Sequence, residues 1–280
     1  MPSNSILVVG ATGKTGRRVV ARLQARNIPV RLGSRSATPS FDWNDRATWA
    51  DSLRDIRAAY ITYYPDLAAP GATEIIQAFT DLAVKSGVRR LVLLSGRGET
   101  EAERCEQIVR NSGVEWTLLR VSWFCQNFSE NYLLEPILAG ELALPVGNVG
   151  EPFVDADDIA DVAVAALTDD RHTGQLYELT GPRLLTFNQA VAEISRMTQR
   201  HIRYVEISMD EYIAELERAQ LPAALVSLFI YLFTEVLDGR NSSVADGVTR
   251  ALGRPARDFT EYVRDAAASG VWQPASSDTR

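Results

Sequence analysis

The chain has 280 residues, of which 46% are hydrophobic, and a formal net charge of −7. This length and apolar content suffice for a large core, either in one α/β domain or in a nucleotide-binding domain with a smaller annex. The acidic balance argues against a self-sufficient nucleic-acid binder, which needs a basic face to neutralise phosphates. Any role near DNA would therefore require another protein.

The two cysteines, Cys105 and Cys125, lack the paired spacing of a metal site. We therefore expect no metal and a reduced, cytoplasmic setting. Because a core strand is predicted within five residues of the start, we expect no signal peptide. The longest apolar run, residues 221–233, is shorter than the roughly 20 residues of a membrane span and predicts a buried or pocket-lining helix. The expected partner is a small-molecule substrate, without direct nucleic-acid or membrane binding, and the sequence leaves the oligomeric state open.

Residues 6–20 predict a buried strand, then a glycine-rich turn, Gly-Ala-Thr-Gly-Lys-Thr-Gly, and then an amphipathic helix. The first glycine permits a tight turn, the second lets backbone N–H groups approach a pyrophosphate, and the third lets the helix pack on the strand. A Walker A loop needs a glycine where this chain has Val8, so a kinase or ATPase is not favoured. The alternative is a glycine turn without a ligand. The predicted phosphate-binding residues are Gly10, Thr12, Gly13, Lys14, Thr15 and Gly16.

Residues 29–36 are predicted to form the second strand and its polar end, which decides the choice of cofactor. An acidic residue here would bind the ribose 2′-hydroxyl of NAD. Arg35, flanked by Ser34 and Ser36, instead offers a cation and hydroxyl donors suited to a 2′-phosphate. This pattern favours NADP(H) over NAD(H). The alternative is that Arg35 only solvates a strand end.

The next segments are expected to line the rest of the cofactor. Residues 41–43 should be a third strand end beside the adenine, where Asp42 accepts from the amino group and Trp43 either stacks on the ring or packs in the core. The strand at 58–62 should bring Thr62 and Tyr63 near the nicotinamide ribose, because ligands bind at the carboxyl ends of strands.

Strands and helices continue to alternate along the chain. A strand at 90–94 ends at Ser95 and Gly96, which are expected to contact the cofactor. A helix follows, and a further strand covers 116–120. Such an order predicts a doubly wound parallel sheet with right-handed crossovers, the Rossmann-like α/β class.

After this sixth strand, residues 121–128 should form the loop that faces the nicotinamide. Trp123 and Phe124 are candidate walls of the substrate pocket, and the alternative for both is ordinary core packing. His172 is expected to be solvent-exposed and non-catalytic, and His201 to be structural.

The predicted domains are an NADP(H)-binding domain at 1–183, with a strand and helix returning after residue 150, and a smaller α/β substrate region at 184–272. The polar tail at 273–280 is expected to be disordered.

Several phrases of the chain, in their order and spacing, resemble the NmrA-like branch of the atypical short-chain dehydrogenase/reductases. The resemblance covers nearly the whole chain and is nearest to quinone reductases and ergot-alkaloid-type iminium reductases. The phrases are the glycine turn at 10–16, residues 89–95, residues 112–120 with Phe124, Asn127 and Phe128 behind them, and residues 153–160, 174–181 and 252–255.

The resemblance implies an NADP(H)-binding extended Rossmann domain with a small C-terminal substrate region, and it adds Asn127 to the candidate pocket. Many relatives carry Tyr-x-x-x-Lys on the helix after the fifth strand. Here residues 95–113 contain neither residue type, and Gly98 and Ala102 stand at those positions. Ser95 or Tyr63 is left as the candidate catalytic hydrogen-bond donor.

Two functions are then open. The glycine turn, Arg35 and the aromatic loop at Trp123 and Phe124 favour the first, and the missing Tyr and Lys pair favours the second. The first is an NADPH-dependent reductase of a small hydrophobic or aromatic acceptor that is already activated, such as a quinone or an iminium, which needs little help from a general acid. The alternative is an NADP(H)-binding redox sensor or regulatory protein without turnover.

Overall fold

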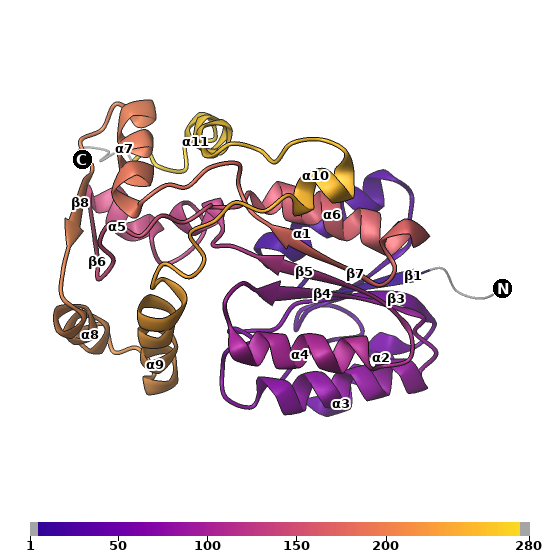
Figure 1. The fold of residues 1–280 in the computed structure, drawn as a ribbon. Coiled ribbons are helices and arrows are strands. Elements are labelled where there is room, and N and C mark those ends of the chain that lie inside the picture. The colour runs from indigo at the N-terminus through magenta and orange to yellow at the C-terminus, as the bar shows by residue number, and fades with distance from the viewer. Residues whose placement is uncertain (1–4, 275–280) are drawn as a thin grey trace, which may run out of the picture. The chain divides into compact units, whose positions relative to one another are not determined.

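The computed structural model describes residues 5–274, and the first of its two compact units is built on a six-stranded sheet (Figure 1). All strand pairs in this sheet are parallel, and the order is β2-β1-β3-β4-β5-β7. The predicted doubly wound parallel sheet is thereby confirmed. The strands are β1 (Ser5–Val9), β2 (Val30–Gly33), β3 (Ile56–Ile61), β4 (Arg90–Gly96), β5 (Glu115–Val121) and β7 (Gln175–Leu179).

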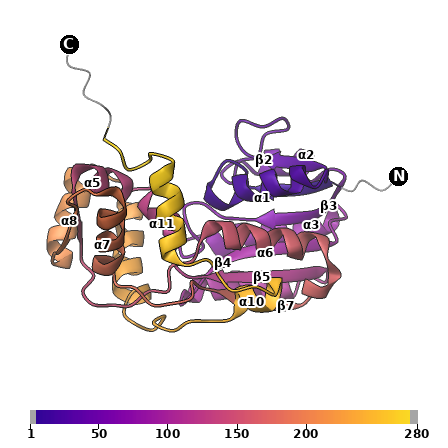
Figure 2. The same cartoon turned by 90° about the horizontal axis from the view of Figure 1, so that it is seen from above.

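Helices cover both faces of this sheet, α1 and α6 on one side and α3 and α4 on the other (Figures 1 and 2). Buried strands of a parallel sheet read as continuous apolar runs because both of their faces are covered. The helical elements of this unit are α1 (Lys14–Ala25), a 3₁₀ turn η1 (Arg46–Thr48), α2 (Trp49–Leu53), α3 (Ala72–Lys85), α4 (Thr100–Arg110), α6 (Ala156–Thr168), a 3₁₀ turn η3 (Asp170–His172) and α10 (Gly247–Leu252).

Ion pairs join the helices on the α1 face. Arg22 of α1 contacts Asp157 at 2.7 Å and Asp161 at 2.5 Å, both on α6. Arg254, which follows α10, contacts the fully buried Asp158 at 2.7 Å and Asp161 at 2.6 Å. Arg254, in the segment 252–255, is therefore the cation that pairs with the buried carboxylate of Asp158. The two residues are far apart in the sequence, so no local pattern predicts this ion pair.

The second unit contains a two-stranded parallel sheet and a separate hydrophobic core. Its central side chains include the fully buried Phe128, Phe187 and Trp272. The elements are a 3₁₀ turn η2 (Cys125–Phe128), α5 (Leu134–Ala139), β6 (Glu141–Leu144), α7 (Phe187–Thr198), β8 (Arg203–Glu206), α8 (Met209–Arg218), α9 (Ala223–Tyr231), a π-helical turn η4 (Leu232–Val236) and α11 (Phe259–Ala268).

The division of the chain is discontinuous, unlike the predicted single boundary after residue 183. The first unit takes the chain up to Ser122 together with Ala156–Thr180 and Ala245–Pro255, and the second takes the remainder. Residues 123–155 join the second unit because Cys125, Phe128 and Phe153 pack in its core. In the predicted disordered tail, residues 275–280 lie outside the described part of the chain.

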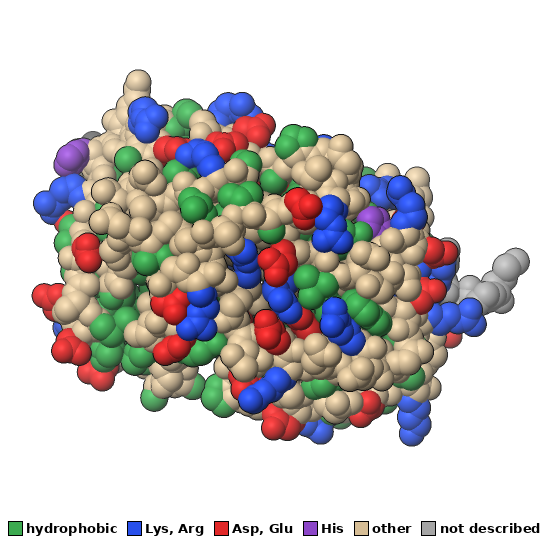
Figure 3. All heavy atoms as spheres, in the orientation of Figure 1, with side chains coloured by type: hydrophobic (Ala, Val, Ile, Leu, Met, Phe, Trp, Pro, Cys, Tyr) green, Lys and Arg blue, Asp and Glu red, His purple; other side chains and the backbone are tan. Residues whose placement is uncertain are grey.

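Helix α9 is not buried, so the structure contradicts the first of the two expectations for the apolar run at 221–233, a buried or a pocket-lining helix. None of its residues is buried, and Leu225, Leu228 and Phe229 are half-exposed. Tyr132 packs against Phe229 at 4.8 Å between ring centroids, so the helix is only partly covered in its own unit. Among residues 5–274, the helices are too short or too polar to cross a membrane. On the face shown in Figure 3, acidic and basic side chains are intermingled.

His172 is buried, which contradicts its expected exposure. It is 4% exposed, and its Nδ1 lies 2.8 Å from the hydroxyl of Tyr177. Its polar neighbours in sequence suggested a surface turn, but the backbone carbonyl of His172 accepts from the buried Thr117 and draws the turn onto β5. Burial lowers the pKa of His172, and the nearby Arg171 and Arg90 act in the same direction, whereas Asp169 opposes them.

This lowered pKa predicts a loss of stability in acid. The unfolded chain protonates His172 near pH 6.5, before the folded chain does, so the free energy of unfolding falls as the pH drops below about 6.5. We expect His172→Gln to remove this part of the pH dependence while costing about 1 kcal/mol at pH 8 through the weakened bond to Tyr177. Urea denaturation at pH 8 and pH 5 measures both effects.

The control is His201→Gln, because His201 is the other histidine of the chain and is exposed. It should leave the pH dependence unchanged. An identical stability difference between wild type and His172→Gln at both pH values would contradict the assignment.

Candidate functional site

The predicted phosphate-binding turn lies between β1 and α1, and its first and last glycines are required by close packing. Gly10 has φ +69°, and a Cβ there would lie 2.2 Å from Oγ1 of Thr62. A Cβ on Gly16 would lie 2.1 Å from the carbonyl oxygen of Gly10. Gly10 N donates to Gly33 O at 2.9 Å, which fixes the turn against the end of β2.

The start of α1 suits an anionic diphosphate. Gly13 is the N-cap residue, with φ −76° and ψ 176°, and no described side chain caps it. The first turn of α1 carries no acidic residue, and Thr12 and Gly13 are exposed. The first amides of a helix have no intrahelical acceptor and carry positive partial charge, so these residues fit the diphosphate of a dinucleotide.

The end of β2 brings polar side chains next to this turn. Ser34 and Ser36 place their hydroxyl oxygens 3.3 Å apart, and Arg35 between them is exposed. Gly33, the last residue of β2, accepts from the amides of both Gly10 and Ala11. The arginine and the two hydroxyls therefore follow directly on the backbone that supports the phosphate-binding turn.

The chain forms a tight turn at residues 42–45, where a strand end was expected at 41–43. The carboxylate of Asp42 accepts from Asn44 N at 2.9 Å, and its backbone pairs with Asp45 in an isolated bridge. Such local side-chain bonds compete with strand pairing. The third strand in sequence, β3, starts only at Ile56.

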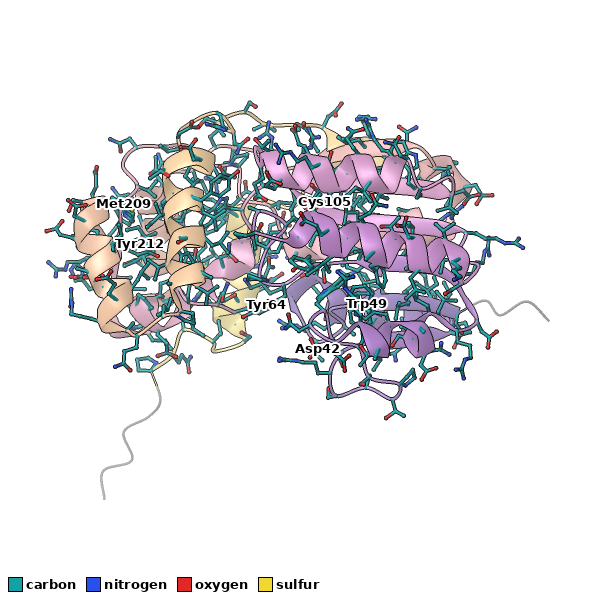
Figure 4. All side chains as sticks on the ribbon, turned by 90° about the horizontal axis from the view of Figure 1, so that it is seen from below. Asp42, Trp49, Tyr64, Cys105, Met209 and Tyr212 are labelled. Atoms are coloured by element: carbon teal, nitrogen blue, oxygen red, sulfur yellow. The ribbon has the colours of Figure 1, made fainter. Side chains whose placement is uncertain are left out.

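Trp43 is half-exposed and belongs to an aromatic cluster with Phe41, Trp49, Phe79 and Tyr63. Its indole Nε1 donates to the backbone oxygen of Thr62 at 3.0 Å. Figure 4 labels Trp49 and Asp42, whose backbone oxygen accepts from Trp49 Nε1 at 2.7 Å. These contacts support the packing interpretation of Trp43.

The exit of β3 joins this aromatic cluster to the phosphate-binding turn. Thr62 Oγ1 donates to Val9 O at 3.1 Å, at the end of β1. Tyr63 lies with its ring 5.3 Å from that of Trp43 and is half-exposed. Burial raises the pKa of Tyr63, with a smaller contribution from Cys105, so its phenol stays protonated and able to donate near neutral pH. Tyr64, labelled in Figure 4, is 77% exposed.

Ser95 is only 2% exposed, and its hydroxyl donates to Glu106 Oε1 at 2.7 Å. Glu106 is fully buried and accepts two bonds from Arg120, at 2.9 and 2.6 Å. No local sequence pattern points to the Ser95–Glu106–Arg120 network, because its members are distant in sequence and each is common in surface helices and strands. The hydroxyl hydrogen of Ser95 is therefore already used in a hydrogen bond inside the protein.

On α4, Ala102 is fully buried in the core of the first unit, and Gly98 precedes the helix with φ +77°. Neither position presents a side chain that could replace the missing tyrosine or lysine.

The candidate pocket residues belong to the second unit. Trp123 is half-exposed and packs against Phe187 at 5.7 Å and Phe233 at 5.5 Å between ring centroids. Phe124 and Asn127 are also half-exposed, and Phe124 pairs with Val154 in a parallel bridge. The loop therefore presents partly exposed aromatic rings on a fixed backbone.

Comparison with known proteins identifies the family. The NAD(P)H-binding family matches residues 10–170. The chain is 30% identical over 282 residues to an NAD(P)H azoreductase of Xenophilus azovorans, covering 94% of this chain and 98% of the relative. It is 32% identical over 278 residues to a (4-alkanoyl-5-oxo-2,5-dihydrofuran-3-yl)methyl phosphate reductase of Streptomyces griseus, covering 92% and 96%.

Among solved structures, an NADPH-dependent quinone oxidoreductase of Escherichia coli in complex with NADPH has a TM-score of 0.77 at 21% identity, covering 93% of this chain and 99% of that chain. This likeness supports the fold. The family match and the two reductase relatives confirm the resemblance to NmrA-like atypical short-chain dehydrogenase/reductases. The chain belongs to the NAD(P)H-binding family.

Proposed function

We propose that this protein is an NADPH-dependent reductase of a small hydrophobic or aromatic acceptor that is already activated, such as a quinone or an iminium. The observation that carries the proposal is the exposed, uncapped start of α1 in a chain that matches an azoreductase along nearly its whole length. The sensor without turnover is not favoured, because both relatives named above are reductases.

The proposed roles follow from the positions of the side chains. When bound, the cofactor supplies the hydride. The N-terminal amides of α1 would hold its diphosphate, Arg35 and Ser36 the 2′-phosphate, and Thr62, Tyr63 and Gly96 would line the part nearer the nicotinamide. Trp123, Phe124 and Asn127 would wall the acceptor pocket.

Tyr63 is the better of the two candidate proton donors. Its phenol is half-exposed and protonated at neutral pH, whereas the hydroxyl of Ser95 is buried and donates to Glu106. We therefore assign Ser95 a structural role beneath the site and Tyr63 the hydrogen bond to the acceptor.

The test is a screen of NADPH oxidation against quinones, iminiums, azo compounds and aldehydes. We expect turnover of at least one activated acceptor and none with Gly13→Asp, which serves as the background. Tight NADPH binding by calorimetry without oxidation in the presence of any acceptor would favour the sensor instead.

The choice of cofactor gives a separate prediction. Arg35→Asp should weaken NADPH binding roughly 10- to 100-fold, because hydrogen bonds to a charged group contribute about 1.5–3 kcal/mol. The new carboxylate should at the same time favour NADH, since it can accept from the ribose 2′-hydroxyl. Calorimetry with both cofactors measures the ratio. If the wild type already binds NADH as tightly as NADPH, the role given to Arg35 is wrong.

A further inference from the structure

Two carboxyl groups meet between two segments that leave the sheet. Asp66 lies in residues 62–71, which connect β3 to α3, and Glu99 is the N-cap residue of α4. Their side chains are hydrogen-bonded to each other. Asp66 also accepts from Ala68 N at 2.8 Å, and the neighbouring Leu67 is 5% exposed in the core of this unit. The connecting segment is therefore fixed both by an apolar anchor and by an acid–acid contact.

The carboxyl group of Glu99 is seated against the backbone of Gly96, at the end of β4. A Cβ on Gly96 would lie 2.1–2.3 Å from the three carboxyl atoms of Glu99. Glu99 is 7% exposed. The absence of a side chain at Gly96 leaves room for this carboxyl group, so Glu99 lies directly against a residue proposed to line the cofactor.

The surroundings of this pair are acidic. The charged groups that act on Glu99 are Asp66 and, about two turns along α4, Glu106. The nearby cations have partners of their own: Arg120 binds Glu106 at 2.6 Å, and Arg97 lies 3.5 Å from Glu178. Tyr63 and Cys105, the other titratable groups of this region, both have pKa values raised by burial and are neutral near pH 7.

A hydrogen bond between two carboxyl groups exists only while the pair holds a proton. Burial, followed by the charge of Asp66, raises the pKa of Glu99 well above its usual range. Burial also raises the pKa of Asp66. The two groups therefore titrate as one coupled pair, with the proton chiefly on Glu99.

We propose that Asp66 and Glu99 form a proton-dependent latch, which holds residues 62–71 against the start of α4 and keeps the NADPH site in its binding form. When the shared proton passes to solvent, two carboxylates face each other at hydrogen-bonding distance and repel, and the segment that carries Thr62 and Tyr63 separates from Gly96. Asp66 and Glu99 are positioning residues. The inference rests on the proposed function in one respect, that Thr62, Tyr63 and Gly96 line the cofactor.

The decisive variant is Glu99→Gln, whose amide can donate to the Asp66 carboxylate without carrying a titratable proton. The dissociation constant of NADPH is measured by calorimetry from pH 5.5 to pH 9. We expect it to rise about tenfold or more across this range in the wild type, the factor that corresponds to one pKa unit of coupling. In Glu99→Gln it should stay flat near the low-pH value. Asp66→Asn should move the wild-type transition to lower pH.

The matched control is Glu103→Gln, on the exposed side of the same helix. It should keep the pH dependence of the wild type. A dissociation constant that is flat in the wild type, or equally pH-dependent in Glu99→Gln, overturns the latch.

A second measurement does not depend on the cofactor. Because the folded pKa values of the pair are raised, the folded state holds more protons than the unfolded state above about pH 4.3, and the stability of the wild type falls as the pH rises toward the raised values. Glu99→Gln should lack this decline, and an equal decline in both proteins overturns the shared proton. If the wild type binds no NADPH at any pH, the proposed function fails and this stability profile alone decides the latch. If NADPH binds but no acceptor is reduced, both measurements of the latch keep their meaning.

Discussion

Gly13→Asp should abolish NADPH binding while the protein remains folded. Gly13 is the exposed N-cap of α1 and has an extended backbone that any residue adopts. Aspartate is a preferred N-cap residue, so the helix itself should not be weakened. Its carboxylate would instead occupy the approach of the diphosphate and repel it. Two unit charges at 4 Å interact by about 4 kcal/mol near a protein surface, which corresponds to a loss of roughly 10³-fold in affinity.

Gly13→Ser separates charge from bulk in this experiment. It introduces a Cβ at the same place, 3.2 Å from Gly10 O, and a neutral side chain of similar capping ability. We expect it to retain a measurable part of the affinity, whereas Gly13→Asp retains none by calorimetry. Thermal unfolding should show that both variants are folded. Unchanged affinity in Gly13→Asp would remove the phosphate site from α1.

The sheet and the phosphate-binding turn could be predicted from the sequence because their signals are local. A continuous apolar run such as residues 6–9 identifies a strand covered on both faces, and the glycine spacing that follows reflects packing within the same seven residues. Ser95 and Gly96 were likewise placed correctly at the end of β4. What was predicted well depends on neighbours in the chain.

The features that were missed depend on partners far along the chain. Glu106 and Arg120 look like ordinary surface charges in sequence, yet they form a buried network with Ser95. His172 sits among polar residues but is buried against Tyr177. Residues 123–155 leave the sheet and pack in the core of the second unit, which a linear domain boundary does not represent. These features are determined by tertiary packing, which patterns in a single sequence do not report.

The structure also decides which rescue experiment is meaningful on α4. Ala102 stands where many relatives carry the catalytic lysine, but its side chain is fully buried in the core. Ala102→Lys would place a charge there without a partner, at a cost of several kcal/mol in stability. We therefore expect this variant to lower the unfolding midpoint strongly and not to restore ketone reduction, since the tyrosine position is Gly98.

The absence of the tyrosine and lysine pair predicts which acceptors are reduced. The difference in turnover between acceptors is the largest effect on activity that we expect. In relatives with tyrosine and lysine, ketone reduction uses a tyrosine proton, and general acid catalysis of this kind typically contributes about 10²- to 10⁴-fold. Here α4 supplies neither group. Quinones and iminiums are activated before the hydride arrives, so we expect their kcat/KM to exceed that of a ketone of similar shape by a factor of that order.

The measurement is kcat/KM with NADPH for a quinone and a matched ketone, in the wild type and in Tyr63→Phe. If Tyr63 only assists, Tyr63→Phe should lower quinone reduction by less than about tenfold, because one neutral hydrogen bond is worth about 0.5–1.5 kcal/mol. Efficient ketone reduction by the wild type that collapses in Tyr63→Phe would identify Tyr63 as a full general acid. Efficient ketone reduction that survives in Tyr63→Phe would place the proton donor elsewhere. In either case the predicted dependence on preactivated acceptors would be wrong. The protein would then have a general acid outside α4, either Tyr63 in the loop after β3 or another side chain.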